Sequence, residues 1–183
     1  KLVGITKLKD YHFYSHRGRH PENYGEEIKL DHKYGIVFAV EMDKEMINRG
    51  PMLAEVIETS KCYVDVSIIG MILSYYIRSL GYEARNHMDG NYLLMPVLVA
   101  RDAGLGEIGR NTVLTTKEYG SRVRLGVVST NLELDVDEPI SFGLEDFCRL
   151  CKNCSYTCPS QSLSNETERE TNGSQNWVIE QES

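Results

Sequence analysis

The feature that most restricts how this chain folds is the run FCRLCKNCSYTCPS at residues 147–160. Its cysteines follow the spacing C-x2-C-x2-C-x3-C and are Cys148, Cys151, Cys154 and Cys158. Gaps this short, with Pro159 directly after the last cysteine, are typical of iron–sulfur ligation in bacterial ferredoxins. A four-cysteine zinc site usually separates two C-x2-C pairs by a longer spacer. The spacing therefore predicts an iron–sulfur site rather than zinc.

The run does not supply a full ligand set by itself. In two-cluster ferredoxins the fourth cysteine of such a run serves a different cluster from the first three. The chain has 5 cysteines in all, and the remaining one, Cys62, lies far upstream. Clustered cysteines in an otherwise cysteine-poor chain also argue against a disulfide framework and against purely structural cysteines.

Composition places the chain among soluble globular proteins. It has 183 residues, of which 41% are hydrophobic and 26% charged, enough for one core and a small appendage. The net charge of -7 and the lack of a basic stripe argue against a nucleic-acid partner. No apolar run approaches the roughly 20 residues that span a bilayer. The chain opens at Lys1 without a targeting segment, and we expect further sequence upstream, so location stays open.

The pattern of apolar residues predicts an α+β fold. We expect a strand at the opening KLVGIT within a loop-rich stretch over 1–33, a buried strand over 34–42, and helical structure over 43–60. The clearest helix covers 63–80 and is apolar on nearly every side, which predicts burial all round. Strands are predicted over 112–116 and 123–130. From Ser160 onward the sequence is polar and is predicted to be a loop or linker.

The glycine-rich segment AGLGEIGRN at 103–111 matches the dinucleotide fingerprint by its letters. That fingerprint requires a strand before it and a helix after it, whereas a strand-like sequence follows here. Two interpretations remain open. The glycines either let the backbone approach a flat or bulky group, or form a tight turn between a helix and a strand.

Three histidines, His12, His16 and His20, are spaced four residues apart. On a helix they would share a face and could bind a metal. Gly18 and Pro21 make the segment a poor helix, so the sequence predicts surface histidines on a loop.

Tyr63 precedes the apolar helix, and Arg122 and Arg124 share one face of the predicted strand at 123–130. By residue type alone, the tyrosine is read as a core aromatic and the arginines as a solvated sheet edge.

Taken together, these segments resemble one enzyme family in order and spacing, over nearly the whole chain. The segments are HKYGIVFAVEMD, YVDVSIIGMILSYYIRSLGYEA, MPVLVARDAGLGEIGRNTVLTTKEYGSRVRLGVVSTNLEL and FCRLCKNCSYTCPSQSL. The family is that of the cobalamin-dependent reductive dehalogenases. The IRSLGY and AGLGEIGRN stretches are the more specific part of the resemblance.

The resemblance implies a nitroreductase-like core over 1–143 that binds base-off cobalamin, followed over 144–183 by part of a bacterial ferredoxin-like module. Electrons would pass through two [4Fe–4S] clusters to the cobalt, which attacks an organohalide. The family's proton-donating tyrosine maps to Tyr63, its basic partner to Arg122, and a substrate-pocket asparagine to Asn91. The corrin would lie along Ala103, Gly104, Leu105, Gly106, Gly109, Arg110 and Asn111.

The sequence also departs from the family. NWVIEQES, at 176–183, ends where the family's second cysteine run begins, and the family's twin-arginine export region is not seen. We therefore expect Cys148, Cys151 and Cys154 to be three ligands of one cluster and Cys158 one ligand of the other, so that both sets are incomplete. The resemblance implies an electron-donor protein or quinol-linked chain, and a membrane-anchor subunit, as partners. It places the enzyme at the exported face of the membrane, with the cytoplasm as the alternative.

The sequence leaves other functions open. Epoxyqueuosine reductases, which modify tRNA, resemble the chain but place an aspartate where Leu93 stands, and an aromatic-rich stretch in place of residues 122–124. A ferredoxin-like electron carrier would not need so large a core ahead of its cysteines. A corrinoid-binding homologue without turnover also stays open.

Overall fold

The computed structural model describes residues 2–166, 168–171 and 173–180. The elements in chain order are β1 (Val3–Lys7), the 3-10 turns η1 (Asp10–His12) and η2 (Pro21–Asn23), β2 (Tyr34–Glu41), α1 (Lys44–Ile47), α2 (Leu53–Ser79), β3 (Ala84–His87), α3 (Pro96–Asp102), β4 (Glu107–Ile108), β5 (Leu114–Thr115), β6 (Val123–Thr130), α4 (Leu144–Cys151), α5 (Asn153–Tyr156), β7 (Arg169–Thr171) and β8 (Ser174–Asn176). The mixed fold predicted from the sequence is confirmed.

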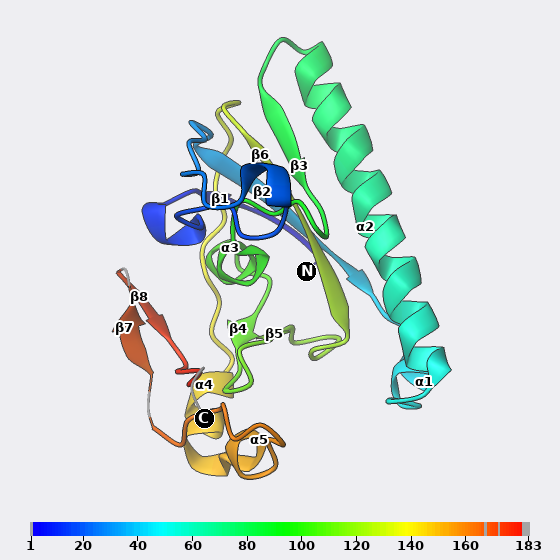
Figure 1. Cartoon of the computed structure of the whole chain (residues 1–183), viewed down its shortest axis with the longest axis vertical. Coiled ribbons are helices and arrows are strands. Elements are labelled where there is room, and N and C mark those ends of the chain that lie inside the picture. Colours follow the sequence, from blue (N-terminus) through cyan, green and yellow to red (C-terminus); the bar gives the residue numbers. More distant parts are fainter. Residues whose placement is uncertain (1, 167, 172, 181–183) are drawn as a thin grey trace.

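The core is an antiparallel sheet in the order β1-β2-β6-β3. Its two central strands are the predicted apolar runs, and they pair from Tyr34 opposite Thr130 to Glu41 opposite Val123. The long helix α2 runs along one side of the sheet, and the short α3 lies on the other side (Figure 1).

Alternation along β2 divides the core into two layers. Val37 and Ala39 pack with Val99 of α3, whereas Phe38 packs with Val66 of α2. Successive side chains of a strand point to opposite faces, so a continuous apolar strand contributes to both layers. This parity also decides which β6 side chains face α2.

The prediction that the 63–80 helix is buried on nearly every side is wrong. The buried positions of α2 form one stripe, Glu58, Cys62, Val66, Gly70, Ser74 and Ile77. Apolar residues on the outer face are exposed, for example Ile72 at 66% and Tyr75 at 63%. The sheet covers one side of the helix, and no other described element covers the opposite side. Although α2 has 27 residues, none of the described helices is apolar enough over a sufficient length to cross a membrane.

Close packing between the layers depends on glycine at two buried points. A Cβ on Gly126 of β6 would lie 2.5 Å from the ring of Phe38 and 3.2 Å from Val66. A Cβ on Gly70 of α2 would lie 2.1 Å from the side chain of Asn86 in β3. The helix can therefore approach the sheet closely at both positions.

The sequence predicted that His12 lies on the surface, but the structure shows it fully buried. The Lys9 amide donates to His12 Nδ1 at 3.0 Å, so Nε2 carries the proton and donates to Asp102 Oδ2 at 3.1 Å. Tyr11 also donates to Asp102, as does Arg101 at 2.8 Å. Burial alone would raise the pKa of Asp102, but the hydrogen bonds from His12 and Tyr11, with the Arg101 charge, hold it well below its usual range. His16 and His20 are exposed, as predicted.

The polar tail was predicted to be a loop or linker. It instead packs against the core. β7 and β8 form a hairpin, drawn in red in Figure 1. Trp177, directly after it, is 6% exposed, belongs to the core cluster on the α3 side, and donates from Nε1 to the Ile108 carbonyl at 2.9 Å. Burial of this one aromatic side chain anchors an otherwise polar segment.

Replacing Gly126 with alanine should lower the free energy of unfolding by about 1–3 kcal/mol, because the added methyl overpacks Phe38 and Val66. Gly18→Ala is the matched control, since a Cβ there meets no atom within 4 Å and the backbone is not left-handed. Urea unfolding of both variants measures the difference. Equal stabilities would contradict the packing described for β6.

Asp102→Asn should destabilise the protein by about 1–3 kcal/mol at neutral pH, because three donors lose their charged acceptor. The folded pKa of Asp102 is lowered, so its contribution is present above the unfolded pKa of about 4 and is lost as the pH falls below it. The stability gap between wild type and variant should therefore shrink below about pH 4. Asp146→Asn, at a side chain 81% exposed, is the control and should change little.

Candidate functional site

A cavity of about 300 Å³ lies where α2, the segment before α3, and the β5–β6 region meet. Tyr14, Tyr63, Tyr92 and Arg124 contribute its polar groups. Apolar side chains complete the lining, among them Pro96, Val97, Val123 and Leu125. A small apolar cavity with a few converging polar groups is the usual form of a small-molecule site.

Tyr63 and Arg124 form a direct pair in this cavity. Arg124 Nη1 donates to the Tyr63 hydroxyl at 3.2 Å, and the guanidinium carbon lies 4.5 Å from the centre of the phenol ring. Arg124 faces α2 because it has the same strand parity as Gly126. Its Nε is buried and has no hydrogen-bond partner among the described residues. The cation is therefore held against the phenol with one donor still free.

Arg122, the residue predicted as the basic partner, lies elsewhere. It donates to Glu41 Oε1 at 3.1 Å and to the Met42 carbonyl at 2.7 Å. Its side chain lies on the same face of the strand as that of Arg124, but the two residues are about 7 Å apart along the strand. That shift carries Arg122 past the end of β2, so the structure brings Arg124 to Tyr63.

Asn91, predicted to contact substrate, is engaged by a neighbour. Its Oδ1 accepts from Arg85 Nη2 at 2.6 Å. The next residue, Tyr92, lines the cavity instead. Burial, with a smaller contribution from Tyr63, raises the pKa of Tyr92 to about 12, so its hydroxyl stays protonated at neutral pH. Tyr14 and Tyr92 were not singled out from the sequence, and their proximity to Tyr63 depends on long-range folding.

A second, largely apolar cavity of about 580 Å³ shares Tyr14, Pro96, Val97 and Thr112 with the first. Thr112 has a φ of 63°, in the left-handed region that non-glycine residues rarely occupy. Strained positions of this kind cluster at functional sites. The apolar, aromatic-edged lining fits one side of a flat macrocycle such as a corrin.

The glycine-rich segment is explained by the chain's own packing. Residues 102–110 are all buried, and Ala103 and Leu105 belong to the hydrophobic core. A Cβ on Gly104 would lie 2.3 Å from the Glu138 carbonyl oxygen, and one on Gly106 would lie 2.2 Å from that of Thr115. These glycines therefore admit neighbouring backbone, and the turn from α3 into β4 accounts for them. Asn111 Oδ1 accepts from the Val113 amide at 3.3 Å.

The cysteine run forms two short helices joined by Lys152, whose φ of 53° is left-handed. Cys148 and Cys151 lie on α4, Cys154 lies on α5, and Cys158 follows. All four are free thiols; Cys151 is exposed and the others are partly buried. Hydrogen bonds from the Ser160 and Ser162 hydroxyls lower the pKa of Cys158 to about 6.

Within the described residues, no three His, Cys, Asp or Glu side chains converge on a point that would hold a single metal ion. An iron–sulfur cluster takes its thiolates on different iron atoms, so its ligands lie farther apart than those of one ion. Soft, accessible sulfur donors on neighbouring short helices fit that chemistry. The run therefore fits a cluster better than a mononuclear metal.

Comparison with known proteins places this geometry in a family. No protein-family model matches the sequence. Over 131 residues, or 72% of the chain, it is 40% identical to the tetrachloroethene reductive dehalogenase of Dehalobacter restrictus, of which it covers 23%. The solved structure of the catabolic reductive dehalogenase NpRdhA matches with a TM-score of 0.85 and 27% identity, over 97% of this chain and 25% of that one.

Epoxyqueuosine reductase from Streptococcus thermophilus has a TM-score of 0.59 and 21% identity, over 89% of this chain and 50% of that one, which shows a shared fold alone. The nitroreductase-like α+β fold implied by the sequence resemblance is thereby confirmed. The chain spans about a quarter of the length of the dehalogenases that it matches. In sequence and in fold, the chain matches the reductive dehalogenases over the part of their length that it spans.

Proposed function

We propose that this chain forms part of an oxidoreductase that removes halide from an organohalide, with Tyr63 as the proton donor. The observation that carries the proposal is the Tyr63–Arg124 pair in a small cavity next to a larger apolar one. It is supported by the relatives, which are named reductive dehalogenases.

The overall reaction replaces a carbon–halogen bond by a carbon–hydrogen bond. An organohalide gains one electron pair and one proton, and it releases halide. A corrinoid bound in the apolar cavity would supply the electron pair at the carbon–halogen bond. One solved relative is described in terms of B12-dependent dehalogenation, which supports this cofactor.

The protein's own part is to deliver the proton and exclude water. Tyr63 gives its hydroxyl proton to the carbon that loses halide, which leaves a tyrosinate. The Arg124 guanidinium, donating at 3.2 Å to that oxygen, stabilises the negative charge as it forms. Tyr92 remains protonated beside it, so its hydroxyl could donate a hydrogen bond to a substrate in the cavity. In this proposal Arg124 takes the role that the sequence gave to Arg122.

The cavity walls indicate how the cofactor would be held. Tyr14, Pro96, Val97 and Thr112 border both cavities and would form the wall along which the macrocycle and the substrate meet. Most of the glycine-rich segment lies inside the core and would support this wall from behind. Its Ile108 lines the larger cavity and would contact the corrin.

The cysteines would supply the electrons. Cys148, Cys151 and Cys154 would serve one [4Fe–4S] cluster and Cys158 a second, the remaining ligands coming from outside the chain described here. Under this proposal, residues 1–143 form the catalytic core, and 144–183 belong to the electron-transfer module. Gly143, left-handed at φ 89°, would then lie at the boundary between the two.

The substrate is proposed to be a small organohalide, consistent with a cavity of about 300 Å³. One relative has been solved with 3-bromo-4-hydroxybenzoic acid, and another is named for tetrachloroethene. An electron-donor protein and a membrane-anchor subunit are the partners expected for such an enzyme. Leu93, 6% exposed and apolar, stands where the tRNA-modifying relatives have an aspartate, which argues against that alternative.

Tyr63→Phe in the full-length enzyme should lower kcat by about 10²–10⁴-fold while corrinoid stays bound, because the ring is kept and the proton is lost. Steady-state dehalogenation with a low-potential donor and the visible corrinoid spectrum measure the two effects. Tyr76→Phe, on the exposed outer face of the same helix, is the control and should keep the wild-type rate. A full rate in Tyr63→Phe would show that the proton comes from elsewhere.

Arg124→Gln and Arg122→Gln separate the two candidate cations. Removing Arg124 should lower kcat by about 10–100-fold, the loss expected when a charged hydrogen bond to a developing anion is removed. Removing Arg122, which contacts Glu41 and Met42, should leave kcat close to wild type. The reverse order of effects would restore Arg122 as the partner of Tyr63.

A further inference from the structure

Arg110 is a buried cation at the junction between the core and the cysteine run. Arg110 lies shortly after β4 in the sequence and is 2% exposed. Nε donates to the Cys148 carbonyl at 3.2 Å, and Nη1 donates to the carbonyls of Ser164 at 2.7 Å and Glu166 at 2.8 Å. The guanidinium carbon lies 4.3 Å from the ring centre of Trp177. One side chain thus contacts both the first cysteine of the run and the segment that follows the last cysteine.

The charge of Arg110 is not balanced by these contacts. Among the residues that the structure describes, its hydrogen-bond partners are all neutral carbonyls, and its Nη2 is buried with no partner. A buried charge is normally paired with an opposite charge, because its desolvation is costly. The Trp177 face offers only part of the compensation. A buried cation with a free donor indicates that an anion belongs beside it.

The position of Arg110 indicates which anion that is. It is hydrogen-bonded to the residue that carries the first thiol of the run. The preceding residue, Gly109, also lies near this thiol, since a Cβ on Gly109 would lie 3.8 Å from Cys148 Sγ. A cluster bound by several thiolates is anionic, and its potential depends on net charge and on hydrogen bonds to its sulfur atoms.

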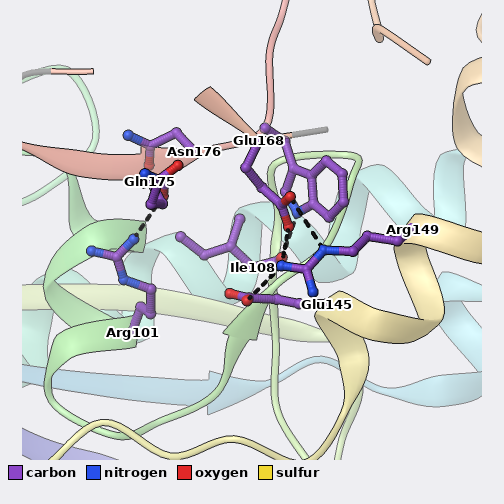
Figure 2. Close-up of a pocket in the computed structure, with 8 residues that line it drawn as sticks. Arg101, Ile108, Glu145, Arg149, Glu168, Gln175 and Asn176 are labelled. Atoms are coloured by element: carbon purple, nitrogen blue, oxygen red, sulfur yellow. Dashed lines mark hydrogen bonds and ion pairs between the residues drawn. The ribbon is translucent and has the colours of Figure 1, made fainter. Parts of the chain in front are cut away.

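Other arginines near the run are already paired. Figure 2 shows the adjacent cavity, of about 390 Å³, in which Arg149 contacts Glu145 and Glu168 and Arg101 contacts Gln175. Arg149 is 45% exposed and also pairs with Asp146. It carries the same charge next to Cys148 without the burial or the free donor, which makes it a matched control.

We propose that Arg110 is a positioning and tuning residue for the cluster held by Cys148, Cys151 and Cys154. Its contacts fix α4 at Cys148 against the core, and its free Nη2 and its charge stabilise the more negative, reduced cluster. This inference rests on the proposed function, and it assigns Arg110 to the cluster rather than to the corrin. Loss of the cation should therefore lower the midpoint potential of that one cluster.

The test uses the full-length protein with its clusters assembled anaerobically, and compares Arg110→Gln, Arg110→Lys and Arg149→Gln. Iron and sulfide content is measured first, and redox titration followed by electron paramagnetic resonance gives the potentials. Arg110→Gln should shift one cluster to a lower potential and leave the second in place. Arg110→Lys should shift it less, because an ammonium keeps the charge but cannot keep all the contacts. Arg149→Gln should stay near wild type, because its charge is screened by solvent.

Several results would overturn the inference. An unchanged potential in Arg110→Gln at full iron content would do so, as would an equal shift in Arg149→Gln. If Arg110→Gln does not fold, Arg110→Lys decides, and a wild-type potential there counts against the inference. A wild-type protein that binds no cluster would refute the cluster assignment itself. A wild-type protein that binds clusters but does not dehalogenate would refute the reaction, and the Arg110 comparison would still stand.

Discussion

The antiparallel pairing of β2 with β6 is the interaction on which the rest of the structure depends. Its register assigns alternate side chains to the α2 layer and the α3 layer, so that Phe38 and Gly126 meet Val66 on one side. The same parity turns Arg124 toward Tyr63. A slip of one residue would send Arg124 into the apolar layer beneath α3. The site is therefore a consequence of strand register rather than of a local motif.

Patterns that depend on neighbours in sequence were readable from the sequence. The apolar run at 34–42 became β2, the run at 123–130 became β6, and the segment after the glycines contains a strand, β5, rather than a helix. Strand parity also put Arg122 and Arg124 on one face. Choosing between them required knowing where β2 ends, which is a fact about pairing across 80 residues or more of chain.

Features fixed by distant contacts were not readable in this way. His12 can be buried because Asp102, from α3, accepts a hydrogen bond from its Nε2, and a histidine in a loop sequence gives no sign of that partner. Trp177 lies in a polar tail, yet its ring packs in the core cluster and its Nε1 donates to the Ile108 carbonyl. The outer face of α2 shows the opposite case, since apolar residues are a poor guide to burial when only one layer covers the helix.

The contacts of Arg110 make the cysteine run a loop that is closed at its base. The guanidinium joins Cys148 at one end to Ser164 and Glu166 at the other, so the chain between them has lost conformational freedom before any ligand arrives. Assembly of a cluster in such a loop needs less further ordering than it would in an open one, and more of the binding energy is retained as affinity. A single side chain in the core thereby lowers the conformational entropy that the cysteine run has to lose when a cluster assembles.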